Sequence, residues 1–256
     1  MSEWNSEQYL KFVKQRTQPA IDLANKINLD NPAEIIDIGC GPGNSTNVLA
    51  KRFPKAHVIG ADNSQNMIDK AKNDYPDLDF ILFNAADESY DIAKKFDVVF
   101  SNACIQWIPE HKRLLNNMMD ILNEGGILAI QTPMNYNEPI HKIIGEISAN
   151  EKWKSKFSNP RIFYNLKQEE YFDILSEISS DFEIWETIYC HRMPSHNSIM
   201  EWYKGTGLRP YLNVLNENDA AEFEKDIYNE LVKFYPIQKN GEIIFRFPRF
   251  FFTAVK

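Results

Sequence analysis

The sequence has few cysteines, no long hydrophobic run and no excess of positive charge. Its three cysteines, Cys40, Cys104 and Cys190, are odd in number, widely separated and not at metal-ligand spacing. That pattern predicts reduced thiols in a cytoplasmic protein and no metal site. No apolar run approaches the roughly 20 residues that cross a bilayer. Residues 1–5 have neither the cationic nor the apolar stretch of a signal peptide, so we expect none.

The charge balance is acidic. Lysine and arginine number 28 against 36 aspartates and glutamates, which gives a net charge of −8 and a pI near 5.2. An acidic chain lacks the electrostatic footprint of a nucleic-acid-binding protein. With 43% hydrophobic and 13% aromatic residues, the chain of 256 residues is rich enough in apolar side chains to fold. We expect no nucleic-acid partner, and the sequence does not indicate the oligomeric state.

Strand and helix patterns alternate through the first half. Short β-branched runs predict strands, and apolar residues at helical spacing predict the helices between them. The expected strands are 34–38, 57–62, 80–83, 97–100 and 126–130, and the expected helices are 44–52, 65–74 and 111–122. This alternation predicts an α/β fold, a doubly wound, Rossmann-like and mostly parallel sheet with helices on both faces.

The pattern changes after Pro133. Residues 134–180 are expected to be mostly helical, 182–193 and 243–255 to be strands, and 196–206 and 219–234 to be helices. We predict a single domain over residues 1–256. Its ligand-binding core would span about 30–133, with helical insertions after the fifth and sixth strands, about 134–181 and 194–241, forming a cap that shapes a second pocket.

A glycine-rich turn follows the first predicted strand. Residues 37–44 read D-I-G-C-G-P-G-N, and glycines there permit positive φ and a close approach of backbone N–H groups to a ligand. Asp62 ends the second strand, where an acid accepts hydrogen bonds from a ribose diol. A glycine-rich turn with only a structural role would not require an acid such as Asp62 at the end of the next strand. A nicotinamide-binding fingerprint would need glycine at Asn44, so the match fails at its last position.

The glycine motif with an acid two residues before it resembles motif I of the class I S-adenosylmethionine-dependent methyltransferases. The resemblance implies their fold and S-adenosylmethionine as cofactor. Asp37 would help to hold its ammonium group, Asp62 its ribose and Asp87 its adenine. The full set that the resemblance implies is Arg16, Asp37, Gly39, Gly41, Gly43, Asp62, Asn63, Met67, Asp87 and Asn102.

The motifs of DNA-modifying methyltransferases are missing. The chain has no D/N-P-P-Y/F tetrapeptide, and none of its cysteines follows a proline. Several blocks instead resemble the trans-aconitate 2-methyltransferase family from end to end. They are the N-terminal S-E-W-N, G-C-G-P-G-N-S-T at 39–46, N-A-C-I-Q-W-I-P at 102–109, Y-F-D-I-L-S-E at 171–177, M-P-S-H at 193–196, T-G-L-R-P at 206–210 and F-P-R at 247–249. The implied reaction is esterification of one carboxylate of trans-aconitate or a related small polycarboxylic acid.

That reaction requires recognition of an anion and no catalytic base, because a carboxylate is already ionised at neutral pH. Residues 243–256 carry three cations and no acid, and residues 187–213 carry two histidines and three cations against one acid. Arginine suits carboxylates because two N–H donors match two oxygens. The predicted acceptor-binding residues are Trp107, Tyr136, His191, His196, Arg209 and Arg249.

Some positions depart from the family pattern. Gln18 replaces an expected arginine, Met134 and Tyr136 replace an Asp and a Trp, and Arg246 stands where a small apolar residue is expected. These changes leave other interpretations open. They are methylation of a different small carboxylic acid or of an acyl-carrier-bound half-ester, and a non-catalytic S-adenosylmethionine-binding module. A nicotinamide oxidoreductase is disfavoured by Asn44.

Overall fold

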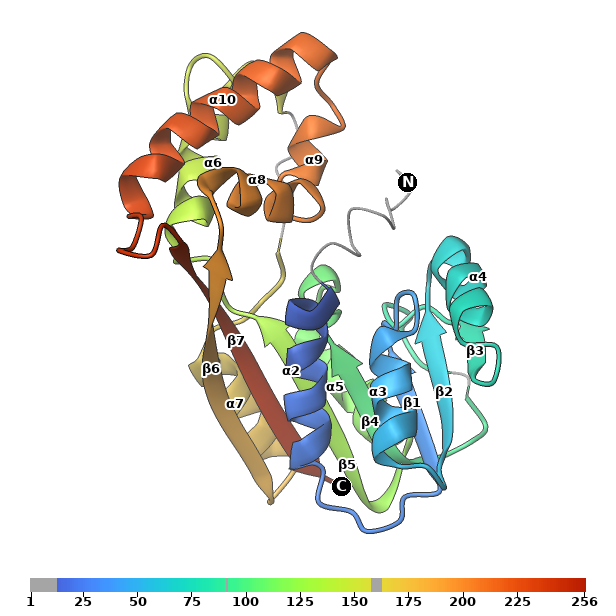
Figure 1. Ribbon diagram of the computed structural model, residues 1–256. Helices are drawn as coiled ribbons and strands as arrows, with labels where there is room; N and C mark the ends of the chain where they lie inside the picture. The colour runs from blue at the N-terminus through green and yellow to red at the C-terminus, as the bar shows by residue number, and fades with distance from the viewer. Residues whose placement is uncertain (1–12, 91, 158–162) are drawn as a thin grey trace. The chain divides into compact units, whose positions relative to one another are not determined.

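The chain forms two compact units (Figure 1). The computed structural model describes residues 13–90, 92–157 and 163–256, without the side chains of residues 13, 14 and 16. Of these described residues, the sheet unit comprises 16–90, 92–133, 163–187 and 249–256, and the helical unit comprises 13–15, 134–157 and 188–248. Among the described residues, no helix combines the length and apolar character needed to cross a membrane.

In the described part of the chain, a seven-stranded sheet has the order β3-β2-β1-β4-β5-β7-β6. Its strands are β1 (Glu34–Ile38), β2 (His57–Asp62), β3 (Asp79–Leu82), β4 (Phe96–Asn102), β5 (Leu122–Pro133), β6 (Phe182–Met193) and β7 (Ile243–Val255). Strands β1 to β5 pair in parallel, and β7 pairs antiparallel with β5. The predicted mostly parallel α/β sheet is confirmed. Strands β6 and β7 each contribute residues to both units.

The helices mostly begin where the sequence predicts. They are α2 (Val13–Lys26), α3 (Asn44–Arg52), α4 (Gln65–Asp74), α5 (His111–Asp120), α6 (Pro139–Ala149), α7 (Gln168–Ile178), α8 (His196–Lys204), α9 (Arg209–Leu212) and α10 (Glu217–Phe234), with 3-10 turns η1 (Ile105–Trp107) and η2 (Lys154–Lys156). Helix α5 ends two residues earlier than predicted because β5 already begins at Leu122. A register shift in the β4–β5 ladder accommodates this early start.

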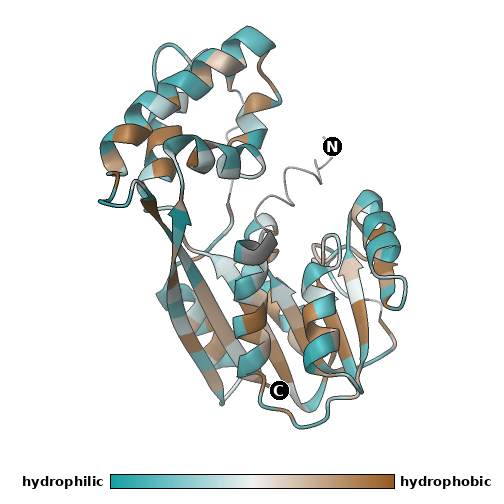
Figure 2. Cartoon of the chain, viewed as in Figure 1, coloured by the Kyte–Doolittle hydropathy of each residue, from teal (hydrophilic) through white to brown (hydrophobic). Residues whose placement is uncertain are grey.

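Alternating residues of β7 show that both faces of the sheet are covered. Phe251 stacks on Trp185 with ring centroids 5.1 Å apart, and Lys26 of α2 lies over the same indole. Phe250, which points to the other face, stacks on Tyr171 of α7 at 5.4 Å. Figure 2 shows hydrophobic residues concentrated along the strands and polar residues on the outer faces of the helices. Burial on both faces explains why residues 250–252 of β7 form a continuous aromatic run.

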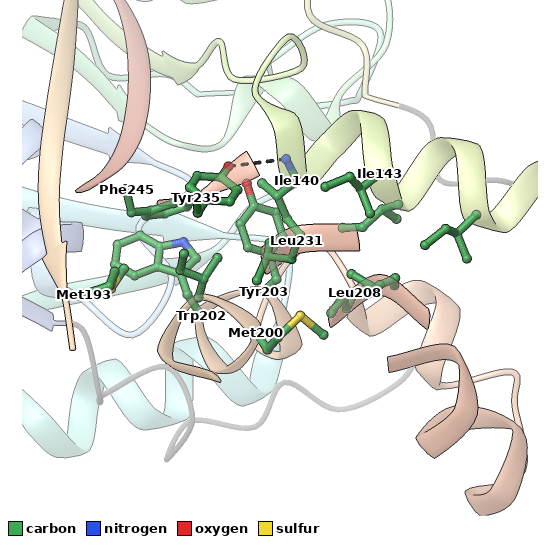
Figure 3. Packing of buried hydrophobic residues seen from close by; sticks show 14 of the residues in the cluster. Ile140, Ile143, Met193, Met200, Trp202, Tyr203, Leu208, Leu231, Tyr235 and Phe245 are labelled. Carbon is green, nitrogen blue, oxygen red and sulfur yellow. Dashed lines mark hydrogen bonds between the residues drawn. The ribbon is translucent and has the colours of Figure 1, made fainter. Parts of the chain in front are cut away.

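The helical unit has its own core (Figure 3). Helix α6 buries isoleucines at positions 140, 143, 144 and 147, one helical face, against residues of α8, α10 and β7. Trp202 and Tyr203 of α8 are almost fully buried there. The hydroxyl of Tyr235 accepts a hydrogen bond from the backbone N–H of Ile140 at 3.3 Å, which satisfies an otherwise unpaired donor in the first turn of α6.

The helical unit includes residues 134–157 and 194–241. Residues 163–181 belong to the sheet unit, where Tyr171 of α7 packs on the aromatic residues of β7. The predicted insertions at about 134–181 and 194–241 stay predictions. That the whole chain folds as one domain, and that the helical unit forms a cap, both stay predictions.

Candidate active site

Several predicted residues lie where parallel strands end. Ile38 of β1 pairs with Ala61 of β2, one residue before Asp62, and Asn102 ends β4. Because β1 pairs in parallel with both β2 and β4, these carboxyl ends meet at one edge of the sheet. Open α/β sheets bind their ligands at this edge. The site described below therefore begins with the loop that leaves β1.

Three glycines in the loop after β1 adopt positive φ, +77° at Gly39, +54° at Gly41 and +90° at Gly43. A Cβ at Gly39 would lie 2.2 Å from Sγ of Cys104, and one at Gly43 would lie 2.8 Å from the ring of Tyr75. Nothing lies within 4 Å of a Cβ built at Gly41. The first and third glycines therefore permit close packing, whereas the second faces open space.

Asp62 holds the glycine loop in place. Its Oδ2 accepts the backbone N–H of Gly41 at 2.9 Å, and its Oδ1 accepts the backbone N–H of Ser64 at 2.9 Å. Burial raises the pKa of this carboxyl. Each carboxylate oxygen can accept more than one hydrogen bond, so both retain capacity for a ligand hydroxyl. The acid thus fixes the loop and can bind a diol at the same time.

Asp37 is fully buried beneath the start of α3. Its Oδ2 accepts hydrogen bonds from the hydroxyls of Ser45, at 2.6 Å, and Thr46, at 2.7 Å. Its Oδ1 is buried without a hydrogen-bond partner. Burial raises the pKa of Asp37 to about 6, and the nearby charge of Asp62 acts in the same direction. The side chain thus combines a structural role with an unused acceptor atom.

The remaining predicted cofactor residues belong to the same unit. Asp87 is exposed, and its Oδ1 accepts from the amide of Asn84 at 2.6 Å. Asn63 is exposed directly after β2, whereas Met67 is buried in α4. Asn102 ends β4, and its Oδ1 is buried without a hydrogen-bond partner. Arg16 lies in α2, but its side chain is outside the described part of the structure.

A buried histidine fixes the turn that carries Trp107. The indole is 41% exposed, and its ring centroid lies 5.2 Å from that of Phe163. Its 3-10 turn, η1, is fixed by His111, whose Nε2 lies 2.9 Å from the carbonyl oxygens of both Ile105 and Ile108. Both partners are acceptors, so Nε2 carries the proton. No local motif distinguishes such a histidine from an exposed one.

Arg249 is a buried residue of β7 in the sheet unit. It is 6% exposed, and its Nη1 donates to Oε1 of Gln131 at 3.4 Å. The structure places it in the same unit as Trp107. The other predicted acceptor residues, Tyr136, His191 and Arg209, belong to the helical unit together with His196.

The two histidines of the helical unit have structural contacts. Nε2 of His196 donates to the backbone carbonyl of Tyr235 at 2.7 Å. The ring of His191 packs on the indole of Trp202 with centroids 5.1 Å apart. These contacts stabilise the strand and helix ends on which the histidines lie. Their predicted role at the acceptor stays a prediction.

Tyr136 is exposed, and Arg209 is partly buried. Tyr136 is 45% exposed after the end of β5. Arg209 begins α9, and partial burial lowers the pKa of its guanidinium. A charged group in a partly desolvated position interacts more strongly with an anion than one in water. The predicted role of Arg209 at the acceptor stays a prediction.

Two of the three lysine and arginine residues within 187–213 already form ion pairs with acidic residues. Arg192 forms an ion pair with Glu242 at 2.7 Å. Lys204 lies 2.7 Å from Glu224 and 3.2 Å from Glu201. Two of these acids are distant in sequence, so counting charges along one segment overestimated its local positive charge. Within the described residues, no group of three or more His, Cys, Asp or Glu could hold a metal ion.

Comparisons with known proteins agree with this geometry. Residues 29–206 match a family described as a methyltransferase domain. The chain is 38% identical over 254 residues to the trans-aconitate 2-methyltransferases of Enterobacter sp. (strain 638) and of Escherichia coli (strain K12 / DH10B), covering 99% of this chain and 98% of each relative. The crystal structure of the YcgJ protein from Bacillus subtilis is similar in fold, with a TM-score of 0.61 and 13% identity over 93% of this chain and 98% of that chain.

Proposed function

This chain belongs to the trans-aconitate 2-methyltransferase family, and on that premise we propose that it transfers a methyl group to one carboxylate of trans-aconitate. It is an S-adenosylmethionine-dependent methyltransferase. The product would be a monomethyl ester of the acid. The observation that carries the proposal is an identity of 38% over 99% of the chain.

The residues at the sheet edge fit the cofactor chemically. S-adenosylmethionine supplies a methyl group on a sulfonium and carries a ribose diol, an ammonium and a carboxylate. Asp62 can accept from the diol, because its loop contacts leave acceptor capacity. The unpartnered Oδ1 of Asp37 is an acceptor that suits an ammonium. The open space over Gly41 leaves room for the bound molecule.

The rest of the cofactor set is proposed from the same comparison. Asp87 would accept from the adenine amino group, and Asn63 and Met67 would flank the adenosine. Asn102 offers a second buried acceptor without a partner. Arg16 would pair with the cofactor carboxylate.

The acceptor chemistry requires alignment and exclusion of water rather than proton transfer. A carboxylate oxygen is anionic at neutral pH, so its attack on the methyl carbon releases no proton. Trp107 and Tyr136 would form apolar walls beside the reacting carboxylate, His191 and His196 would contact the acid, and Arg209 and Arg249 would bind its other carboxylates. The guanidinium of Arg249 is buried, and a buried charge would interact with a substrate carboxylate more strongly than one in water.

Methylation of a different small carboxylic acid is the second candidate function. Tyr136, Met134 and Arg246 depart from the family pattern. Arg246 is exposed on β7, and its charge lowers the pKa of Glu138, which burial raises. This acidic neighbour reduces the attraction of Arg246 for a substrate anion.

The test uses the purified protein with methyl-labelled S-adenosylmethionine and a panel of acids. Trans-aconitate, other tricarboxylates and dicarboxylates are each incubated with the protein, and base-labile methyl esters are counted. We expect the highest kcat/KM for trans-aconitate. A higher value for another acid would support the second candidate, and no ester from any acid would contradict both.

A further inference from the structure

A buried side-chain amide at the carboxyl end of β5 has no role in the proposed cofactor site. Gln131 is fully buried, and its Nε2 has no hydrogen-bond partner. Its Oε1 accepts from Nη1 of Arg249. A guanidinium has only donors, so this contact fixes which end of the amide faces Arg249. The NH₂ group is therefore directed elsewhere, and leaving it buried without a partner is unfavourable.

Strand register places Gln131 beside two predicted site residues. Gln131 pairs with Asn102 across β4 and β5, and Pro133 pairs with Arg249 across β5 and β7. Paired residues and residues two apart on a strand project to the same face. Oδ1 of Asn102 is also buried without a hydrogen-bond partner. One face at the end of these strands thus carries an unused donor and an unused acceptor next to a buried guanidinium.

The backbone of Gln131 is hydrogen-bonded to the turn after β4. Its carbonyl oxygen accepts the N–H of Ala103 at 2.9 Å. Ala103 has φ +56°, a left-handed conformation that is strained for a residue with a Cβ. The carbonyl of Ala103 accepts from Nε2 of Gln106 at 2.6 Å, within the turn that carries Trp107. The amide of Gln131 is thus held on a backbone that these contacts fix.

We propose that Gln131 is a specificity-determining residue for the acceptor, and that its Nε2 and the guanidinium of Arg249 bind one carboxylate that is not methylated. Two donors side by side match the two oxygens of a carboxylate. The amide oxygen of Gln131 is uncharged, and its contact with Nη1 of Arg249 orients the guanidinium beside the amide. The inference rests on the proposed polycarboxylate substrate and names the residue that distinguishes it from acids with fewer carboxylates.

The experiment compares Gln131→Leu and Gln131→Glu with wild type. Gln131→Leu removes the donor at similar volume, and we expect KM for trans-aconitate to rise at least tenfold, with a smaller change in kcat. Gln131→Glu adds a negative charge that repels the acid, so its KM should rise further. A structural role predicts the opposite order, because a glutamate would pair with Arg249 and restore stability and activity. Affinity for S-adenosylhomocysteine, measured by calorimetry, should stay within twofold.

Glutaconate, mesaconate and itaconate each lack one carboxylate of trans-aconitate. Wild type should prefer trans-aconitate over the dicarboxylate that lacks the carboxylate bound by Gln131 and Arg249. Gln131→Leu should abolish that preference. An equal loss on all four acids, unchanged kinetics, or weaker S-adenosylhomocysteine binding would overturn the proposal. Gln168→Leu is the control, because Gln168 is a partly exposed glutamine whose side chain donates a hydrogen bond to Glu186, and it should change neither constant.

Two further controls separate the possible failures. Thermal unfolding identifies a variant that does not fold, and if Gln131→Leu unfolds, Gln131→Asn provides the same comparison because its shorter amide withdraws the donor while remaining polar. Absence of wild-type activity on every acid would contradict the proposed function. Wild-type activity with unchanged Gln131 variants would contradict this inference alone.

Discussion

Nδ1 of His111 lies 2.7 Å from the hydroxyl of Tyr171, and both side chains are buried. Because Nε2 of His111 donates to two backbone carbonyls, Nδ1 is the acceptor and Tyr171 is the donor. Burial lowers the pKa of His111, which favours this neutral ring. The contact joins α7 to His111 of α5, which holds the turn that carries Trp107.

Tyr171→Phe should therefore destabilise the protein. The change leaves Nδ1 of His111 buried without a donor, which typically costs about 1–3 kcal/mol in the free energy of unfolding. Urea denaturation measures the effect. Tyr136→Phe is the control, because Tyr136 is 45% exposed, and it should change stability by less than about 0.5 kcal/mol. Equal stability of the Tyr171 variant and wild type would contradict the assigned tautomer.

Asp62→Ala should weaken cofactor binding. The change removes an acceptor for two ribose hydroxyls, each worth on the order of 1 kcal/mol, and releases the N–H of Gly41. Affinity for S-adenosylhomocysteine should fall by roughly tenfold to a hundredfold in calorimetry. Asp79→Ala is the control, because Asp79 lies at the opposite end of the parallel strands, at the start of β3. A folded Asp62→Ala protein with wild-type affinity would exclude this placement of the ribose.

Gly41→Ala should mainly weaken cofactor binding, whereas Gly39→Ala should mainly destabilise the fold. A Cβ at Gly41 meets no atom within 4 Å, so the fold should lose about 1 kcal/mol through its positive φ while cofactor affinity falls more. A Cβ at Gly39 would collide with Cys104, so this variant should be far less stable. Cys104→Gly in the same chain should partly restore the second variant, as thermal unfolding would reveal. No rescue would mean that φ at Gly39 is the main constraint.

Cofactor affinity should depend on pH because of Asp37. Its pKa in the folded protein is raised to about 6, so the carboxyl takes up a proton as the pH falls through that value. The ammonium of the cofactor attracts the ionised form, so affinity should fall below about pH 6, and binding there should release protons. In the ligand-free protein the same shift makes stability decrease as pH rises from 3.8 toward about 6, because the folded state binds more protons.

Calorimetry in two buffers of different ionisation enthalpy measures this proton release. Asp37→Asn is the matched variant, since it keeps the shape of the side chain and cannot titrate. Its affinity for the cofactor should be lower than that of wild type and should vary less with pH. Asp62 titrates in the same direction, because burial also raises its pKa, so some dependence should persist. Affinity that is identical at about pH 5 and about pH 7 in wild type would contradict a role for Asp37 at the ammonium.

Arg209→Ala should lower kcat/KM for trans-aconitate at least tenfold, because truncating one partner of a desolvated charge pair costs about 2–5 kcal/mol. Arg209→Lys should recover only part of the loss, since an ammonium lacks the planar fork. Donor affinity should not change. Arg192→Ala is the control, because Arg192 is already paired with Glu242 and exposed, and it should retain wild-type kinetics. Wild-type kcat/KM in Arg209→Ala would remove this residue from the acceptor site.

The sequence alone predicted most of the sheet. Strands 34–38 and 57–62 and helices 44–52 and 65–74 have the predicted bounds, because glycines and polar turns interrupt clear apolar patterns there. Strand β5 begins four residues before the predicted start at 126, because it pairs with β4 through a register shift that no apolar pattern records.

The candidate site was predictable where it follows a motif. The glycine loop and Asp62 lie together at the sheet edge as expected. Gln131 and His111 were not identified, because their importance depends on partners that are distant in sequence, such as Arg249 and Tyr171. The same reason explains why Arg192 and Lys204 looked available from their own segment, although acids elsewhere pair with them.

The three cysteines differ in a way that serves experiments on this protein. Burial raises the pKa of the Cys104 thiol to about 12 and that of Cys40 still higher, so both remain protonated and slow toward maleimides. Cys190 on β6 is exposed. A single fluorophore or spin label can therefore be attached at Cys190 without mutagenesis, in the helical unit and away from the glycine loop in sequence. Probe signals from that position would report on the helical unit while ligands are added.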